Sequence, residues 1–288
     1  MDQISLKAPA KINIYLKVLG KRLDGYHEIE SLMQAVDLYD MITLEKSDTF
    51  ELTCDDPRLP VDDTNLALKA ALVLREKFYF PGVKIDLKKN IPHGAGLGGG
   101  SSDAAFVIRG LCKMYNLQPN SNDILMIASY LGSDVRFFFG NGQALARGRG
   151  EIIETIKMPT SYDIVIVVPP VSISTADVYR KLKISLTKKS ESTLLKTGIT
   201  ISRLNNLATR LGNDLEEVVV QYYPELGELK KILREAGAIA ALMTGSGSAF
   251  FGIFASGKSR RSEIQDRVAQ GTEIFECKPI ILSSFGVD

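Results

Sequence analysis

The chain has 288 residues, of which 45% are hydrophobic and 24% are charged, and its formal net charge is +1 at pH 7. This composition is typical of a soluble globular protein with one large domain or two ordinary ones. A near-neutral chain without basic blocks argues against a nucleic-acid partner, and no apolar run reaches the length of a membrane span. The three cysteines are odd in number and widely spaced, so we expect no disulfide scaffold and a reducing, cytoplasmic location.

The first predicted element is a strand over residues 6–18, where polar and apolar residues alternate. Lys11 and Asn13 fall on the same face of this strand, about 7 Å apart. A solvated polar face is the alternative explanation for the lysine. The strand therefore offers two polar side chains that point the same way, either into a site or into water.

A turn at residues 21–27 follows the strand, marked by the Asp-Gly pair at 24–25. It places Tyr26 next to His27. A tyrosine ring can stack on a flat ligand and an imidazole can hydrogen-bond to one, although such a pair also serves simply to anchor a loop. Both interpretations stay open for this turn.

The next elements are predicted from hydrophobic period and from helix caps. They are strands at 35–45 and 50–54, expected to pair, a helix capped at 62–65 and ending near 78, a strand at 83–87, and a helix at 122–131.

Residues 94–100 hold five glycines in seven positions, and an apolar-faced helix is predicted directly after them, from Ser101. Backbone N–H groups at the start of a helix form an anion site, because the helix dipole is positive there. Glycine also lets the backbone approach a phosphate without a Cβ in the way. A plain turn or linker is the alternative, but a linker would have polar flanks. The segment predicts a phosphate-binding loop.

Common templates for such loops do not fit this one. A dinucleotide fold needs an acidic residue about 20 positions after its G-x-G-x-x-G, and residues 115–122 contain none. A Walker A loop needs a lysine where Gly100 stands. The H-R-D and D-F-G sequences of protein kinases do not occur. The two histidines and three dispersed cysteines show no metal-site spacing, so the metal ligands are unknown.

Asp134 follows the predicted helix at 122–131 and precedes the apolar run Phe137–Phe139. A partly buried carboxylate is a candidate general base. The alternative is a helix cap for the next segment, and the sequence does not decide between them. A basic turn at 147–151 ends the first half of the chain.

The pattern restarts from Tyr162, and we place a domain boundary near residue 155. The strands and helices beyond it follow a β-α-β-β-α-β order, which is the split pattern of ferredoxin-like folds. The strands are predicted at 164–168, 239–243, 249–254 and 273–282, the helices near 179 and at 202–211, 214–221, 225–236 and 259–269, and a polar surface segment at 185–200.

Three segments in order, Pro9–Asn13, Pro92–Ser102 and Thr244–Gly247, resemble the motifs of the GHMP small-molecule kinases. The resemblance runs from about Lys7 to the C-terminus. It implies an α+β fold of two domains, a ribosomal-S5-like ATP domain at 1–155 and a ferredoxin-like substrate domain at 156–288. It also implies a small-molecule substrate, ATP as co-substrate, Mg²⁺, and a protein that acts as a monomer or weak homodimer.

Within this superfamily, the segments 24–27, 132–135 and 148–151 resemble one branch. The enzymes of that branch transfer the γ-phosphoryl group of ATP to the C2 hydroxyl of 4-diphosphocytidyl-2-C-methyl-D-erythritol in the non-mevalonate isoprenoid pathway. By this resemblance, Lys11 and Asp134 are the catalytic residues. The ATP-binding residues implied are Asn65, Pro92, Gly94, Ala95, Gly96, Leu97, Gly98, Gly99, Gly100, Ser101 and Ser102. The acceptor-binding residues implied are Asn13, Tyr26, His27, Thr175, Tyr179, Gly245, Ser246 and Gly247.

The chain departs from the family pattern at three places. Arg136 stands where proline is usual after the Asp-Val pair, Ala176 where proline is common, and Tyr179 where phenylalanine is common. The remaining alternatives are a homoserine or mevalonate kinase, an NAD-binding oxidoreductase, and a nucleotide-binding protein without catalysis. The first would not need the Tyr-His pair, and the last would not need Lys11 together with Asp134.

Overall fold

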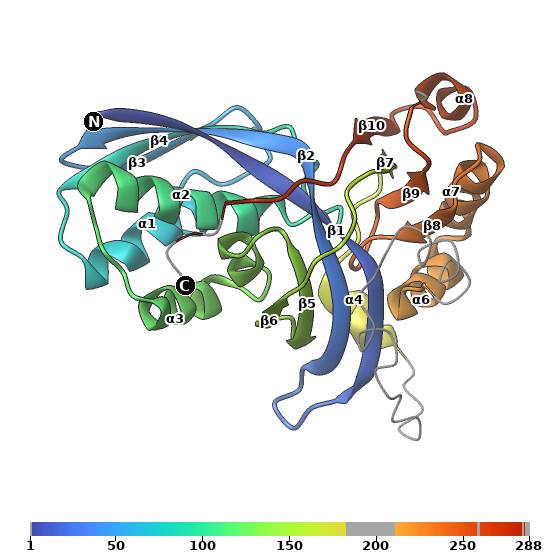
Figure 1. Ribbon diagram of the computed structural model, residues 1–288, viewed down its shortest axis with the longest axis horizontal. Helices are drawn as coiled ribbons and strands as arrows, with labels where there is room; N and C mark the ends of the chain where they lie inside the picture. The colour runs from blue at the N-terminus through green and yellow to red at the C-terminus, as the bar shows by residue number, and fades with distance from the viewer. Residues whose placement is uncertain (1, 183–210, 258–259, 284, 286–288) are drawn as a thin grey trace.

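The computed structural model describes residues 2–182, 211–257, 260–283 and 285. It is an α+β structure with two sheets, one from each half of the chain (Figure 1). The α+β, two-part fold expected from the sequence is confirmed. The polar segment predicted at 185–200 and the helix predicted at 202–211 lie outside the described residues.

The first sheet has six strands in the order β3-β4-β2-β5-β6, and β1 pairs with β2. Its strands are β1 (Gln3–Lys21), β2 (His27–Ser47), β3 (Phe50–Cys54), β4 (Gly82–Lys88), β5 (Gln143–Gly148) and β6 (Ile152–Thr155). The antiparallel β1–β2 hairpin is long and extends beyond the rest of the sheet toward the second half of the chain (Figure 1). It carries the predicted polar face of residues 11 and 13 and the turn at 21–27.

The expected pairing of segments 35–45 and 50–54 is wrong. β4 lies between them, antiparallel to β2 and parallel to β3. Gly82 makes this insertion possible, because a Cβ there would lie 2.5 Å from the carbonyl oxygen of Thr49 in the turn between β2 and β3. The backbone N–H of Val83 donates to that carbonyl at 2.9 Å, so β4 enters the sheet directly at the turn.

Three helices cover one face of the first sheet, α1 (Leu66–Lys77), α2 (Gly99–Tyr115) and α3 (Ser121–Leu131). Asn65 caps α1 as predicted, its side chain accepting from the N–H of Ala67 at 3.0 Å. α2 begins two residues before the predicted start, because Gly98 takes the left-handed N-cap conformation. The 3-10 helix η1 (Val135–Phe139) follows α3.

The second sheet has the order β10-β7-β9-β8, entirely antiparallel, which is the arrangement of a ferredoxin-like fold. Its strands are β7 (Asp163–Val168), β8 (Ala240–Met243), β9 (Phe250–Phe254) and β10 (Glu273–Cys277). The helices in this half of the chain are α4 (Thr175–Lys181), α6 (Asp214–Tyr222), α7 (Pro224–Glu235) and α8 (Arg261–Gln265).

The second sheet is buried on both faces. Val165 and Val167 pack with the helices, whereas Ile164 and Ile166 pack against Ile12 and its neighbours on β1. This is why β7 is apolar at every position from Ile164 to Val168. The β1–β2 hairpin is therefore shared by both halves of the molecule, and its residues can reach a site between them.

The C-terminal end differs from the sequence expectation. β10 stops at Cys277 instead of residue 282, and the chain then returns to the first half, where it crosses beside β1 and β2 (Figure 1). Pro279 pairs with Val36, and the N–H of Ile280 donates to the carbonyl of Ala35. A proline has no N–H to continue the ladder with β7. The domain boundary near residue 155 stays a prediction.

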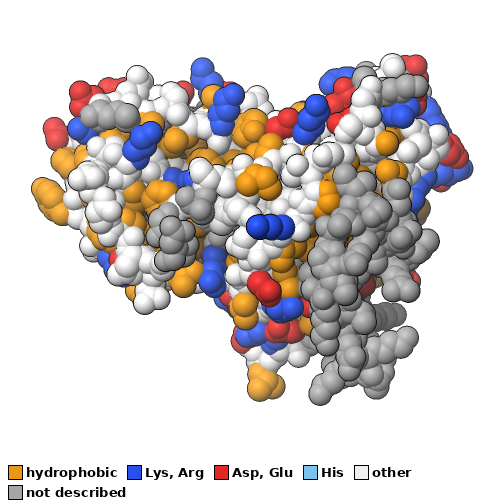
Figure 2. All heavy atoms as spheres, in the orientation of Figure 1, with side chains coloured by type: hydrophobic (Ala, Val, Ile, Leu, Met, Phe, Trp, Pro, Cys, Tyr) orange, Lys and Arg blue, Asp and Glu red, His pale blue; other side chains and the backbone are white. Residues whose placement is uncertain are grey.

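The surface carries both signs of charge. On the face in Figure 2, basic side chains are interspersed with acidic ones and with scattered apolar groups. No helix in the described part of the chain combines the length and the apolar character needed to span a bilayer.

Candidate active site

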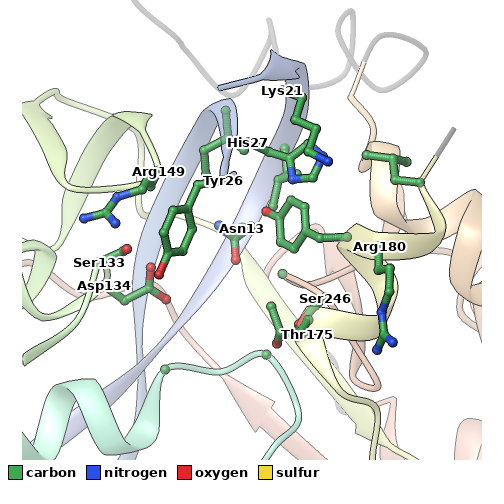
Figure 3. A pocket seen from close by; sticks show the side chains of 18 of the residues that line it. Asn13, Lys21, Tyr26, His27, Ser133, Asp134, Arg149, Thr175, Arg180 and Ser246 are labelled. Atoms are coloured by element: carbon green, nitrogen blue, oxygen red, sulfur yellow. Dashed lines mark hydrogen bonds between the residues drawn. The ribbon is translucent and has the colours of Figure 1, made fainter. Parts of the chain in front are cut away.

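A cavity of about 950 Å³ opens where the β1–β2 hairpin, the glycine loop and the second half of the chain meet. Its walls come from β1, from the turn before β2, from the segments around Asp134 and Arg149, from α4, and from the loop between β8 and β9 (Figure 3). The predicted site residues that line it are Lys11, Asn13, Tyr26, His27, Gly96, Gly98, Asp134, Thr175, Tyr179, Gly245 and Ser246.

Lys11 and Asp134 form an ion pair at the floor of the cavity, with Nζ 3.2 Å from Oδ2. Lys11 is only 3% exposed, so its solvated-face interpretation is wrong. Asp134 precedes η1, but its side chain makes no capping hydrogen bond, so the helix-cap interpretation is wrong as well. The Asp134 side chain keeps 34% of its surface exposed, so a ligand in the cavity can reach it.

Asn13 holds the lysine in place. Lys11 Nζ donates to Asn13 Oδ1 at 2.6 Å, and Asn13 Nδ2 donates to Ser31 Oγ at 2.7 Å. The backbone N–H of Asn13 donates to Thr244 Oγ1, a residue 231 positions away, at 3.0 Å. Ser31 lies across the hairpin on β2. No local sequence signal marks Ser31, because its role appears only when β1 and β2 pair.

The glycine loop packs tightly between β1 and the loop that follows β8. A Cβ on Gly98 would lie 2.9 Å from Lys11 Cγ, and one on Gly96 would lie 2.3 Å from the carbonyl oxygen of Thr244. Both glycines have positive φ, +73° and +79°. The backbone N–H of Lys11 donates to the carbonyl of Leu97 at 2.9 Å. Glycine is required here by close approach as well as by backbone conformation.

The 17-residue helix α2 starts directly after this loop, so its first backbone N–H groups have no partner within the helix. They and the positive end of the helix dipole make the loop an anion site. Gly94 and Gly100 are exposed, and Gly96, Gly98, Gly99 and Ser101 are half-buried. Together they form an accessible rim beside the ion pair.

The other predicted ATP residues lie away from the cavity wall. The side chains of Ala95, Leu97 and Ser102 are buried, and Pro92 is half-buried before the loop. Asn65 uses its side chain at the start of α1, where Nδ2 also donates to the carbonyl of Pro60 at 2.8 Å. Gly247 packs against Met243 behind the lining residues. Contact of these residues with ATP or the acceptor stays a prediction.

Aromatic side chains line the same cavity, and in Figure 3 the Tyr26 ring points toward Asp134. The rings of His27 and Tyr179 stack with centroids 5.1 Å apart and 25° between their planes. Tyr26 lies between Arg149 and Asn13 in Figure 3, and the guanidinium carbon of Arg149 is 4.5 Å from the Tyr26 ring centroid. This leaves the other side of the Tyr26 ring toward the cavity, where a flat group can stack on it.

Two of these aromatic side chains have shifted pKa values. Burial, and then the charge of Lys21, lowers the pKa of His27 below its ordinary 6.5, so the imidazole is neutral at neutral pH. Burial, and then the charge of Asp134, raises the pKa of Tyr179 to about 12. Both rings are therefore uncharged aromatic surfaces under ordinary conditions.

The loop after β8 and the start of α4 close the cavity from the second half of the chain. The hydroxyls of Thr175 and Ser246 lie 2.6 Å apart, and the Ser174 side chain caps α4. Ala176, which stands where proline is common in the family, lines the cavity. Arg136, which also stands in place of a proline, donates to the carbonyl of Glu151 at 3.0 Å and so ties η1 to the β5–β6 turn.

Four polar or charged lining residues were not predicted as site residues, namely Lys21, Ser133, Arg149 and Arg180. Lys21 and Arg149 belong to turns that the sequence analysis identified, so their positions were visible but their direction was not. Arg180 comes one residue after the predicted Tyr179. Three of the four are cations, so the cavity favours an anionic ligand.

Comparison with known proteins agrees with this geometry. Residues 65–142 match the family model of the GHMP kinases N terminal domain, and residues 193–272 match that of the GHMP kinases C terminal. A protein of Caldicellulosiruptor saccharolyticus named 4-diphosphocytidyl-2-C-methyl-D-erythritol kinase is 44% identical over 255 residues, covering 87% of this chain and 88% of that protein. A protein of Bacillus cytotoxicus with the same name is 41% identical, also over 87% of this chain.

The chain belongs to the GHMP kinases. A crystal structure of 4-(cytidine 5'-diphospho)-2C-methyl-D-erythritol kinase superposes on this GHMP kinase with a TM-score of 0.79 and 32% identity, covering 96% of this chain and 99% of the other. A homoserine kinase from Cytophaga hutchinsonii has a TM-score of 0.75 at 21% identity, which shows the shared fold alone. As a GHMP kinase the protein is a small-molecule phosphotransferase that uses ATP as co-substrate.

Proposed function

We propose that this kinase transfers the γ-phosphoryl group of ATP to the C2 hydroxyl of 4-diphosphocytidyl-2-C-methyl-D-erythritol, forming the 2-phosphate and ADP in the non-mevalonate isoprenoid pathway. The observation that carries the proposal is a single cavity lined both by aromatic rings, those of Tyr26, His27 and Tyr179, and by the ion pair of Lys11 with Asp134. A cytidine-bearing acceptor fits this lining, since its base can stack on a ring while its hydroxyl reaches the carboxylate. The names of the relatives at 41–44% identity support the same substrate.

In the proposed mechanism, Asp134 orients the acceptor hydroxyl and accepts its proton. Lys11 lies 3.2 Å from the carboxylate and is itself held by Asn13, so both groups are positioned before the substrates bind. The lysine also offsets the negative charge that develops on the transferred group. Phosphoryl transfer depends mainly on positioning and electrostatics, which a preorganised pair supplies.

We place the triphosphate of ATP along the glycine loop, where backbone N–H groups at the start of α2 can donate to phosphate oxygens. Gly96 and Gly98 line the cavity beside Lys11, so a γ-phosphate on the loop would lie near the ion pair. The sugar-phosphate part of the acceptor would run past Thr175 and Ser246 toward Tyr26.

The donor set also fits Mg²⁺. In kinase sites this ion is held by one or two carboxylates together with substrate phosphates and water. Asp134 is the carboxylate among the described lining residues, and the described part of the chain holds no cluster of three or more metal-binding side chains. Because Asp134 pairs with Lys11 and accepts the hydroxyl proton, the phosphates of ATP and water would hold the ion, which when bound neutralises charge on the phosphate oxygens.

The test is ADP release with purified protein, Mg²⁺-ATP and one acceptor at a time. We expect turnover with 4-diphosphocytidyl-2-C-methyl-D-erythritol and none with homoserine or mevalonate. Turnover with homoserine or mevalonate alone would reverse the assignment. ATP binding without turnover of any of the three would instead favour a nucleotide-binding protein.

The remaining expectations belong to the same proposal. The protein acts in the cytoplasm as a monomer or weak homodimer, without nucleic acid or a membrane.

A further inference from the structure

Three charged side chains are buried together beneath the glycine loop, outside the cavity. Asp40 on β2 is fully buried, and the side chains of Lys89 and Asp103 are 7% and 3% exposed. Lys89 follows β4 and donates to both carboxylates, to Oδ2 of Asp40 and, at 2.7 Å, to Oδ2 of Asp103. We call Asp40, Lys89 and Asp103 the buried charge cluster. Nothing in the proposed chemistry uses these residues.

The cluster contacts the chain on both sides of the glycine loop. Before the loop, Asp40 Oδ1 accepts from the backbone N–H groups of Asn90 at 2.7 Å and Ile91 at 2.8 Å. After the loop, Asp103 lies in the second turn of α2. Directly above, a Cβ on Gly99 would lie 3.3 Å from Asp40 Oδ2. The two ends of the loop are thus joined through one ammonium group.

The cluster has two carboxylates for one cation. Burial raises the pKa of Asp103 to about 7, the charge of Lys89 opposes this, and the charge of Asp40 adds to it. Burial alone lowers the pKa of Lys89, but the two carboxylates outweigh it and raise that pKa. Asp103 Oδ1 has no hydrogen-bond partner. The cluster therefore has a net charge near −1 when Asp103 is ionised and near zero when it is protonated.

We propose that Asp40, Lys89 and Asp103 are positioning residues that hold the two ends of the glycine loop together and set the affinity of that loop for the triphosphate of ATP. The proposal rests on the proposed function, since it needs ATP on the loop. The buried charge cluster would thus influence ATP binding from outside the cavity. The cluster fixes the loop backbone, and its charge state changes the potential beneath the phosphates.

The charge effect has a defined sign. Groups facing Asp103 are Lys89 and Asp40, and Asp55 after β3 accepts from the backbone N–H of Lys89 at 2.8 Å. When pH rises through about 7, Asp103 loses its proton and an uncompensated negative charge forms under the loop. ATP is an anion, so its binding should weaken. By linkage, bound ATP should in turn raise the pKa of the cluster.

The deciding variant is Asp103→Asn, which keeps the size of the side chain and an oxygen that can accept from Lys89, but cannot ionise. The dissociation constant of ATP with Mg²⁺ is measured by calorimetry from about pH 6 to pH 8.5. The ratio of the wild-type constant to the variant constant should be near one at the acid end. It should rise at the alkaline end, by up to about tenfold for each unit by which ATP raises the pKa of the cluster. ATP itself titrates alike in both experiments, so the ratio isolates the cluster.

A second variant tests the joining role. Lys89→Met leaves two buried carboxylates without a cation, and we expect the dissociation constant of ATP to rise about tenfold or more, which corresponds to 1.4 kcal/mol. The KM of the acceptor should change little, because the cluster does not line the cavity. Lys77→Met is the matched control. It removes an ion pair with Asp123 between α1 and α3, away from the loop.

The outcomes separate the two proposals. A ratio that does not change with pH, or a folded Lys89→Met protein that binds ATP like Lys77→Met, overturns the role of the cluster. If Lys89→Met does not fold, Asp103→Asn alone decides. Wild-type protein that binds no ATP would refute the proposed function itself.

Discussion

Replacing Gly96 by alanine tests whether the glycine loop and the loop after β8 form one site. Gly96 has a φ of +79°, which costs an L-residue about 1–2 kcal/mol. The new Cβ would also lie 2.3 Å from the carbonyl oxygen of Thr244 and 3.2 Å from that of Gly247. These are backbone atoms, so no side chain can rotate away. Overpacking of this kind costs about 1–3 kcal/mol, and the total loss should be about 2–5 kcal/mol.

Gly237→Ala is the matched control. Gly237 has a φ of +92°, but a Cβ there would meet no atom within 4 Å. It should lose only the conformational part, about 1–2 kcal/mol. The difference between the variants therefore isolates the contact between the two loops.

The assay compares the free energy of unfolding in denaturant and the steady-state kinetics of both variants. Gly96→Ala should also raise the KM of ATP and of the acceptor, because the carbonyl that must move adjoins Gly245 in the cavity wall. Gly237→Ala should keep wild-type kinetics. Equal losses of stability in the two variants, or wild-type KM values for Gly96→Ala, would refute the close packing of the loops.

Asp134→Asn should bind both substrates but lower kcat by about 10²–10⁴, as expected for loss of a general base, and near-normal turnover in a rapid-quench assay would remove that role. Tyr26→Ala should raise the KM of the cytidylated acceptor about 5- to 150-fold, from a stacking free energy of about 1–3 kcal/mol, and leave the KM of ATP unchanged. Arg149→Ala removes the guanidinium from the Tyr26 ring, so it should raise the KM of the acceptor by a smaller factor. An acceptor KM equal to that of the wild type would contradict this. Burial and the charge of Lys21 keep the pKa of His27 below 6.5. The KM of the acceptor should therefore be constant from about pH 8 to pH 6.5 and rise only below pH 6.5. An inflection above pH 6.5 that His27→Gln abolishes would contradict a neutral imidazole.

Much of the fold and part of the site could be predicted from local pattern. The alternation of residues 6–18, the Asn65 cap and the glycine run before α2 all reappear in the structure. These features depend on neighbours within a few positions, which is the range that hydrophobic period and capping rules cover. The same rules could not place β4 between β2 and β3, since strand pairing joins segments distant in the chain.

The sequence by itself determined that this chain carries a glycine run at the start of a helix and the ordered motifs of a GHMP kinase. Only the tertiary structure decided that Lys11 is a buried partner of Asp134, that Asp134 does not cap its helix, and that Gly96 is held against Thr244. The period of a strand reports which residues share a face, but not what lies opposite that face. Burial and partnership belong to the assembled chain, so the charge of Lys11, and likewise that of Lys89, acquires a role only after the sheets and α2 have packed.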